Sequence, residues 1–178
     1  MMSIECPDEA VIRRLTTLSE RDIAELAAVL IDCVEAGASV SFMYPLSRTR
    51  AEGFWQGLAE DVAQGGRVLL AAADRDGIVG TVQVILAQPE NQPHRADVAK
   101  MLVHRRGRRR GIGAALMRAA EGCARAAGKT PLVLDTASDA AERIYVRLGW
   151  ELVGTVPDYA LLPHGGLCST RFYYRRLG

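Results

Sequence analysis

The spacing of apolar positions changes along the chain from helical to extended and back. A short strand is expected at Val11–Leu15, and Ser19 then has the features of an N-cap, since Asp22 follows three residues later. Apolar residues next recur at helical spacing, which predicts a first helix that ends at Gly37. A second stretch with the same spacing predicts a helix over residues 49–64.

From residue 68 the pattern becomes extended and rich in β-branched residues. Residues 68–73 and 78–87 are predicted to form a hairpin, because the four residues between them are turn formers that end in glycine. A polar loop separates this hairpin from a strand predicted over residues 95–103. In a strand with a period of two, Asp97 and Met101 would lie on the same face.

The last third of the chain alternates between helices and strands. Residues 111–127 carry a narrow stripe of small apolar residues, which predicts a helix able to pack closely on a sheet. Residues 132–136 are expected to form a strand and residues 139–148 a helix. Two further strands are expected at residues 150–156 and 170–176. The order of elements predicts an α/β fold around one mixed sheet, formed by residues 1–178 as a single domain.

Composition excludes several classes of function. The 178 residues are 49% hydrophobic and 24% charged with a net charge of +1, which is typical of a globular domain and argues against a general nucleic-acid binder. The four cysteines and three histidines have no metal-ligand spacing, so no metal is expected and the thiols are expected to be free. Neither a signal sequence nor a membrane-length apolar stretch is seen, which predicts a soluble, cytoplasmic protein without a membrane partner.

A glycine-bearing turn joins the strand at residues 95–103 to the following helix. It contains the pattern R-x-x-G-x-G at Arg108, Gly111 and Gly113. A strand that opens a helix in this way directs unpaired amides and the positive end of the helix dipole at one point, which suits a pyrophosphate. The turn lacks the GK[ST] ending and the first glycine of G-x-G-x-x-G. A basic nucleic-acid patch would account for the five arginines nearby but not for the glycines.

A second signature lies at residues 141–151, which fit A-x-x-x-Y-x-x-x-G-[FW]. Together the two motifs resemble the GNAT superfamily of N-acetyltransferases, and the order of elements extends the resemblance over nearly the whole chain. The resemblance implies a mixed, mostly antiparallel sheet of about seven strands with about four helices, and acetyl-CoA as co-substrate. Short strings at residues 37–43, 100–101 and 134–136 look most similar to the tabtoxin-resistance type of acetyltransferase.

The resemblance also assigns contacts to the coenzyme. Ser138 stands where many relatives carry an asparagine that contacts the coenzyme. Arg105 and Arg106 are expected only to face solvent. The strand backbone would bind the pantetheine arm and acetyl carbonyl and the turn would bind the pyrophosphate, through Met101, Leu102, Val103, Arg108, Arg109, Arg110, Gly111, Ile112, Gly113 and Ala114.

Acetyl transfer to an amine calls for a base and an acid. An alkylammonium with a pKa near 10 is only about 0.1% neutral at pH 7, so a base in contact or through water is useful. Asp97 is the first candidate because it resembles the acid that many relatives carry on this strand, and Asp135 and water are the alternatives. Either aspartate could instead pair with an arginine. Tyr145 resembles the family's general acid, which would protonate the departing thiolate, although a helical tyrosine is often a core residue.

The acceptor cleft is expected between the loop at residues 39–44 and a late loop at residues 157–168. The acceptor is predicted to be a small-molecule amine, and the narrower resemblance suggests a toxin or antibiotic. Direct transfer is predicted because no cysteine adjoins a histidine or either signature. Acetylation of a protein or peptide, and a non-catalytic acyl-CoA-binding module, are the alternatives, and either a monomer or a homodimer is compatible. The residues predicted to line the acceptor cleft are Ser39, Phe42, Met43, Tyr44 and Tyr159.

Overall fold

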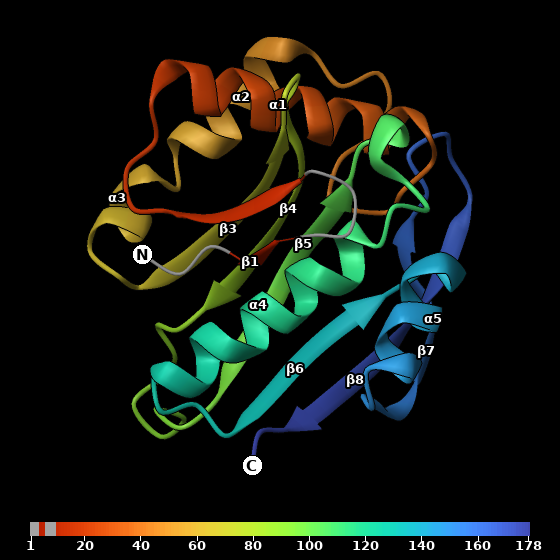
Figure 1. The fold of residues 1–178 in the computed structure, drawn as a ribbon. Coiled ribbons are helices and arrows are strands. Elements are labelled where there is room, and N and C mark those ends of the chain that lie inside the picture. Colours follow the sequence, from red (N-terminus) through yellow and green to blue (C-terminus); the bar gives the residue numbers. More distant parts are fainter. Residues whose placement is uncertain (1–3, 6–9) are drawn as a thin grey trace.

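Helices cover both faces of a twisted sheet in the computed structural model, which describes residues 4–5 and 10–178 (Figure 1). The strands are β1 (Ile4–Glu5), β2 (Val11–Leu15), β3 (Arg67–Asp74), β4 (Gly77–Ile85), β5 (Ala96–Val103), β6 (Pro131–Thr136), β7 (Glu151–Leu161) and β8 (Leu167–Arg176). The helices are α1 (Glu20–Glu35), α2 (Arg48–Gln56), α3 (Ala59–Ala63), α4 (Ile112–Ala126) and α5 (Asp139–Arg147), with a 3₁₀ turn, η1, at Arg105–Gly107.

The sheet has the order β1-β2-β3-β4-β5-β6-β8-β7, and its neighbours are antiparallel except β5 and β6. This confirms the predicted α/β fold with a mixed, mostly antiparallel sheet, to which the two-residue strand β1 adds an eighth strand. The parallel pair β5 and β6 is joined only at its start, where Ala96 pairs with Leu132 and Asp97 with Val133. Beyond this point the two strands diverge (Figure 1).

Alternation along β3 shows how the two faces are filled. Val68 and Leu70 pack in a cluster with α4, whereas Leu69 and Ala71 pack in a cluster with α1 and α2. The side chains of all four residues are almost completely buried. Because both faces of the central strands are covered, these strands read as continuous apolar runs in the sequence.

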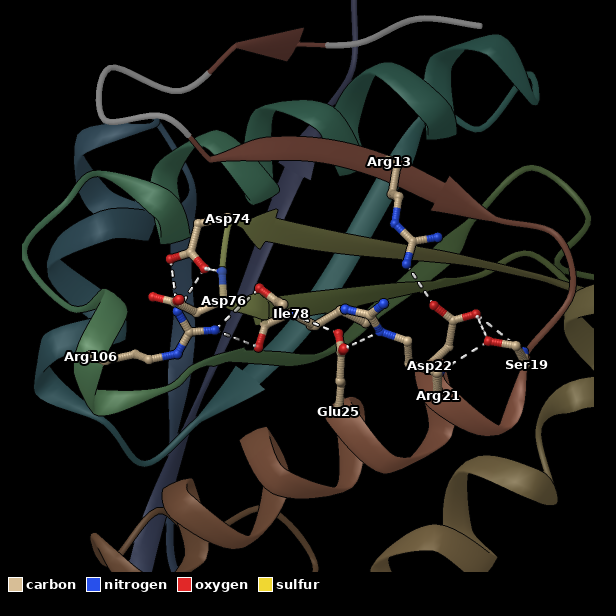
Figure 2. A network of polar contacts seen from close by, with 10 residues as sticks. Arg13, Ser19, Arg21, Asp22, Glu25, Asp74, Asp76, Ile78 and Arg106 are labelled. Carbon is tan, nitrogen blue, oxygen red and sulfur yellow. Dashed lines mark hydrogen bonds and ion pairs between the residues drawn. The ribbon is translucent and has the colours of Figure 1, made fainter.

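The start of α1 follows the sequence prediction closely. The Ser19 hydroxyl accepts a hydrogen bond from the Asp22 amide, and the Asp22 carboxylate accepts one from the Ser19 amide, each at 3.1 Å. Arg13 on β2 also donates to Asp22, as Figure 2 shows. The capping box therefore fixes both the first residue of α1 and its position against the sheet.

The predicted helix at residues 49–64 is wrong as a single element. The chain forms α2, is interrupted at Gly57, and resumes as α3 after Leu58. Gly53 and Gly57 weaken the helix, because glycine costs about 1 kcal/mol relative to alanine at a helical position. Side-chain packing then determines where the helix breaks, and the break allows both Trp55 of α2 and Val62 of α3 to be buried.

Strand β7 extends further than the sequence pattern indicates. It was expected to end at residue 156, but it continues to Leu161, so that the first five residues of the predicted late loop are strand. The register with β8 shifts between Val156 and Ala160, and Asp158 has a positive φ of 53°. Pro157 lies within this bulge, where no ladder hydrogen bond is required of it.

Strand β5 contains a bulge that the sequence did not reveal. Leu102 is opposite Thr81 and Ala99 is opposite Gln83, so two residues of β5 face one residue of β4. The first of the two, Lys100, has a positive φ of 50°. One extra residue on a single strand reverses the alternation of its side chains beyond that point.

The reversal changes one of the sequence predictions. Before the bulge Val98 packs with the α4 cluster, and after it Leu102 packs with the α1 cluster. Asp97 therefore lies on the α1 side of the sheet, whereas Met101 packs against the α4 cluster. The prediction that Asp97 and Met101 share a face is wrong, because a period of two holds only in an uninterrupted strand.

Candidate functional site

The divergence of β5 from β6 leaves two strand edges without a neighbouring strand. On β5 the open edge includes Met101, Leu102 and Val103, which the sequence analysis singled out as backbone contacts of the coenzyme. Backbone amides and carbonyls on such an edge need partners when they are covered. An extended ligand can therefore bind here by adding its own polar groups to the sheet.

The N-terminus of α4 follows β5 after the η1 turn. Gly111 is its N-cap and has a φ of 75°, which a residue with a side chain adopts only at a cost. The Ala115 amide donates to the Gly111 carbonyl at 3.1 Å, so the preceding amides of Ile112, Gly113 and Ala114 have no acceptor within the helix. Three amides at the positive end of a helix form a binding site suited to an anion.

Gly113 marks a point of close approach between α4 and its neighbours. A Cβ atom at this position would lie 2.9 Å from Cδ1 of Ile144 and 3.5 Å from the Sδ atom of Met101. The glycine thus allows α4 to approach both α5 and the end of β5. It brings the amides of the α4 N-terminus next to the open strand edge.

Two arginines of the turn bind one buried carboxylate on β3. Figure 2 shows Arg106, which donates to Asp74 and to the Gly77 and Ile78 carbonyls. Arg110 also donates to Asp74. Burial opposes the ionisation of Asp74, but these hydrogen bonds lower its pKa to about 2. The contacts fix the turn to the β3–β4 hairpin.

A second buried carboxylate, Asp32 on α1, binds the start of the same turn. It accepts hydrogen bonds from the backbone amide of Arg105, at 2.8 Å, and from the Arg105 side chain, which also pairs with Glu35. The expectation that Arg105 and Arg106 only face solvent is therefore wrong. Both residues anchor the turn. Their partners are far away in the sequence, so no local pattern predicted these contacts.

The remaining two arginines of the predicted phosphate set differ from each other. Arg108 donates to the Val103 carbonyl at 3.4 Å and lies 3.9 Å from Asp32. Arg109 is exposed, has a φ of 64°, and forms no hydrogen bond or ion pair with the described residues. Of the arginines in this turn, Arg109 is thus the one most accessible to a bound phosphate, and the coenzyme contacts themselves stay a prediction.

Tyr145 lies on α5 with its side chain almost completely buried. Its ring is 6.0 Å from Trp150 and 6.1 Å from Tyr173, measured between centroids. Burial, together with the negative charge of Asp135, raises the pKa of Tyr145 well above its usual range. The hydroxyl is therefore protonated at neutral pH, and it donates to no acceptor among the described residues.

Asp135 on β6 lines a cavity of about 260 Å³ on the α1 side of the sheet. Its carboxylate accepts a hydrogen bond from the Thr170 hydroxyl at 3.0 Å. The cavity brings together most of the predicted acceptor residues and adds several from β7 and β8. Its lining consists of Ser39, Ser41, Phe42, Met43, Asp135, Ala137, Tyr159, Ala160, Leu161, Cys168 and Thr170.

Tyr44 is the one predicted acceptor residue that does not line this cavity. Its amide donates to the Pro163 carbonyl at 3.0 Å, and its ring stacks obliquely on His164 with centroids 4.7 Å apart. Both contacts join the α1–α2 loop to the β7–β8 loop. The side chain of Tyr44 thus holds the two loops together on the outside of the cavity.

Asp97, the first candidate for the base, is held by neighbouring polar side chains. It accepts hydrogen bonds from Arg95 and, at 3.1 Å, from Nε2 of Gln88. It does not line the cavity that contains Asp135. This arrangement matches the alternative in which the acid pairs with an arginine, and a role of either aspartate as a base stays a prediction.

Ser138 has a clear structural role as the N-cap of α5. Its hydroxyl accepts from the Ala141 amide at 3.3 Å, and its own amide donates to the Thr136 hydroxyl at 3.0 Å. The short turn between β6 and α5 is closed by these bonds. A contact between Ser138 and a coenzyme stays a prediction.

Lys100, Asp32 and Thr170 are among the polar residues that sequence reasoning overlooked, and Lys100 and Asp32 are the two with a signal in the sequence. The Nζ atom of Lys100 donates to the Ser41 hydroxyl, at 3.2 Å, and Ser41 is part of the cavity lining. Lys100 interrupts an apolar strand, and Asp32 stands among the buried positions of an amphipathic helix.

Metal and membrane features are absent from the part of the chain that the structure describes. No group of three or more histidine, cysteine, aspartate or glutamate side chains there is placed to hold a metal ion. Over the same residues, no helix has the length and apolar character needed to cross a membrane. Cys33, Cys123 and Cys168 are free thiols, and Cys6 lies outside the described residues.

The chain matches the model of one protein family, and many solved structures have a similar fold. The sequence profile described as an acetyltransferase (GNAT) domain matches residues 64–152. YncA from Salmonella typhimurium, assigned as an acetyltransferase and solved with acetyl-CoA, has a TM-score of 0.77 and 16% identity, covering 96% of this chain and 95% of that one.

Two further structures are similar over almost their whole length. A GNAT phosphinothricin acetyltransferase from Sinorhizobium meliloti, in complex with acetyl-CoA, has a TM-score of 0.77 and 20% identity, covering 96% of this chain and 89% of that one. The ribosomal-protein-alanine N-acetyltransferase from Brucella melitensis has a TM-score of 0.75 and 24% identity, covering 93% and 99%. These levels of identity establish a common fold and leave the acceptor open.

Proposed function

Because this chain belongs to the GNAT acetyltransferase family, we propose that it transfers the acetyl group of acetyl-CoA to the amine of a small molecule. One observation carries the proposal: neighbouring residues connect the amides at the start of α4, which suit an anion, with the small cavity that Asp135 lines. Gly113 at the start of α4 adjoins Met101 on the open edge of β5 and Ile144 on α5. Tyr145, which follows Ile144 on α5, interacts electrostatically with Asp135, and Asp135 lines the cavity.

The donor end of this site suits coenzyme A. The amides of residues 112–114 and the side chain of Arg109 would bind the pyrophosphate. The pantetheine arm would run along the open edge of β5, at residues 101–103, and the thioester would then lie close to Tyr145. The similar proteins from S. typhimurium and S. meliloti, which were solved with acetyl-CoA, support this choice of donor.

The reaction needs three proton transfers besides the attack. Asp135, directly or through water, would accept a proton from the acceptor ammonium, and the neutral amine would attack the thioester carbonyl carbon. The attacking nitrogen, now positively charged, would lose a second proton to water as the carbon–sulfur bond breaks, and the Tyr145 hydroxyl would donate a proton to the departing thiolate. Water then reprotonates Tyr145 and takes the proton from Asp135, so that the products are the amide, free coenzyme A and one proton.

We propose direct transfer within a ternary complex. Burial raises the pKa of the Cys33 thiol to about 11, and burial also raises the pKa of Cys123. Both are therefore poor nucleophiles at neutral pH. Cys168 lines the cavity, with its sulfur 3.7 Å from the Ser39 hydroxyl, and no histidine contacts it among the described residues.

The acceptor is proposed to be a small molecule because the cavity that would bind it has a small volume. Its volume of about 260 Å³ is below the range of roughly 300–1,000 Å³ that is typical for drug-sized ligands. The toxin or antibiotic amines proposed as acceptors are therefore those smaller than a typical drug, and the similarity in fold to a phosphinothricin acetyltransferase supports testing such compounds first. The resemblance to the tabtoxin-resistance type stays part of this proposal.

The test is a screen of amines that follows the release of free coenzyme A thiol. Purified protein with acetyl-CoA is offered small amines, amino acids, toxin and antibiotic amines, and peptides with free N-termini, while calorimetry measures acetyl-CoA binding. Turnover of small amines in preference to peptides is expected, without an acetylated cysteine in the mass spectrum of the enzyme. Binding of acetyl-CoA without turnover of any amine would overturn the proposal in favour of a non-catalytic module.

A further inference from the structure

Lys100 occupies an unusual place at the bulge of β5. It is a residue with a side chain that is held at a positive φ inside a strand. Such a conformation is costly for a residue other than glycine, and it persists only where the surrounding structure maintains it. The bulge directs the lysine to the α1 side of the sheet, where its Nζ atom is 3.2 Å from the Ser41 hydroxyl and 5.9 Å from the centre of the Phe54 ring.

The charge of Lys100 has no direct counter-ion. No carboxylate among the described residues forms an ion pair with it, and its one hydrogen-bond partner is neutral. Burial lowers the pKa of Lys100, while the more distant charge of Asp135 acts in the opposite direction. The other cation nearby, Arg67, is already engaged by Asp61 and Gln83. A half-buried ammonium without an anion is a place where an anionic ligand is favoured.

The ammonium is connected to the acceptor cavity. Ser41, which accepts its hydrogen bond, lines the same cavity as Asp135. A ligand in the cavity therefore meets a carboxylate from β6 and a hydroxyl that is backed by a lysine. Phe42, Met43 and Tyr159 supply apolar walls. The arrangement complements a zwitterion with an apolar side chain.

We propose that Lys100 and Ser41 bind the carboxylate of the acceptor, and that the acceptor is a free amino acid or a close analogue. The inference rests on the proposed acetyl transfer and names its substrate class. The amine would lie toward Asp135 and the carboxylate toward Lys100. A peptide N-terminus carries a neutral carbonyl where the amino acid has its carboxylate, so the same lysine disfavours peptides.

The experiment compares pairs of acceptors that differ only in this charge. L-Methionine, L-leucine and L-phenylalanine are each measured against the corresponding amide, at saturating acetyl-CoA, by thiol release. We expect the wild-type protein to favour the acids by about tenfold or more in kcat/KM, as for a partly buried charge pair. A wild-type preference for the amides would overturn the proposal.

Two variants test whether Lys100 is the cause. In Lys100→Met the ratio of acid to amide should fall to within about threefold of unity, whereas Lys100→Arg should retain most of the preference because it keeps the charge. A preference that persists in Lys100→Met would overturn the proposal. Ser41→Gly, which removes the hydroxyl and accepts the positive φ of 75° at this position, should lower the ratio by a smaller factor.

A binding measurement separates this inference from the proposed reaction. Calorimetry on the protein loaded with coenzyme A compares N-acetyl-L-methionine with its amide, and needs no turnover. Tighter binding of the acid, lost in Lys100→Met, supports the anion site even if every amine fails to react. Turnover of amines with equal binding of acid and amide would leave the reaction intact and overturn the anion site.

Discussion

The two ends of the site are constructed in different ways. The turn that leads into α4 is fixed by buried carboxylates, since Asp32 holds Arg105 and Asp74 holds Arg106 and Arg110. The acceptor cavity is closed instead by two loops that meet through few bonds, such as that from the Tyr44 amide to the Pro163 carbonyl at 3.0 Å. A donor site built on backbone and buried ion pairs is costly to alter. An acceptor site built on loop side chains can change its ligand without disturbing the fold.

The largest effect is expected at Tyr145, where the two ends meet. Tyr145→Phe should lower kcat by about ten- to a thousandfold, because the departing thiolate loses its proton donor. The affinity for acetyl-CoA, measured by calorimetry, should change little. Tyr174→Phe is the matched control, because Tyr174 does not line the cavity and its hydroxyl donates to Glu151, and it should change kcat by less than about threefold. An unchanged kcat in Tyr145→Phe would remove the acid role.

The next effect separates the two candidate bases. Asp135→Asn should lower kcat/KM by about tenfold or more, since the base in the cavity is lost. Asp97→Asn should change it by less than about threefold, because Asp97 is already engaged by Arg95 and Gln88. Profiles of kcat/KM against pH for both variants provide the measurement. The reverse order of effects would restore Asp97 as the base.

A smaller effect is expected from the donor end. Gly113→Val should weaken acetyl-CoA binding by about tenfold, since a Cβ atom there would lie 2.9 Å from Ile144 and displace the amides of the α4 N-terminus. Gly122→Ala is the control on the same helix, because its Cβ would meet nothing within 4 Å. It should leave binding unchanged and stabilise the protein by about 0.5–1 kcal/mol. Equal binding by both variants would contradict the proposed anion site.

Substitution of Asp74 is expected to affect catalysis least. It should instead lower the stability of the folded protein. The pKa of Asp74 is about 2 in the folded protein against the usual 3.8, so its contribution to stability is present above 3.8 and is lost as the pH falls toward 2. Asp74→Asn should lower the free energy of unfolding near pH 7 by about 1–2 kcal/mol. Urea denaturation at several pH values should also show a weaker loss of stability in acid than in the wild type.

Sequence reasoning succeeded where the determinants are local. The cap at Ser19 and the glycine-bearing turn that opens α4 each follow from a few adjacent residues. It failed where a distant partner decides the outcome. Arg105 is held by Asp32, which is 73 residues away, and neither position reveals the other. A single extra residue at Lys100 likewise reversed the faces of β5, because a bulge is set by strand pairing that periodicity does not report.

Strand β7 is the last in the sheet order, and it exposes Leu152, Val153 and Val156 to solvent. An uninterrupted edge of eleven residues with such side chains would be a template for pairing with other chains. Irregularities in the pairing with β8, between Leu152 and Gly154 and between Val156 and Ala160, interrupt that edge twice. Because a bulge shortens the regular run with which another strand could pair, the same irregularity that hid the length of β7 in the sequence makes this edge a poorer template for aggregation.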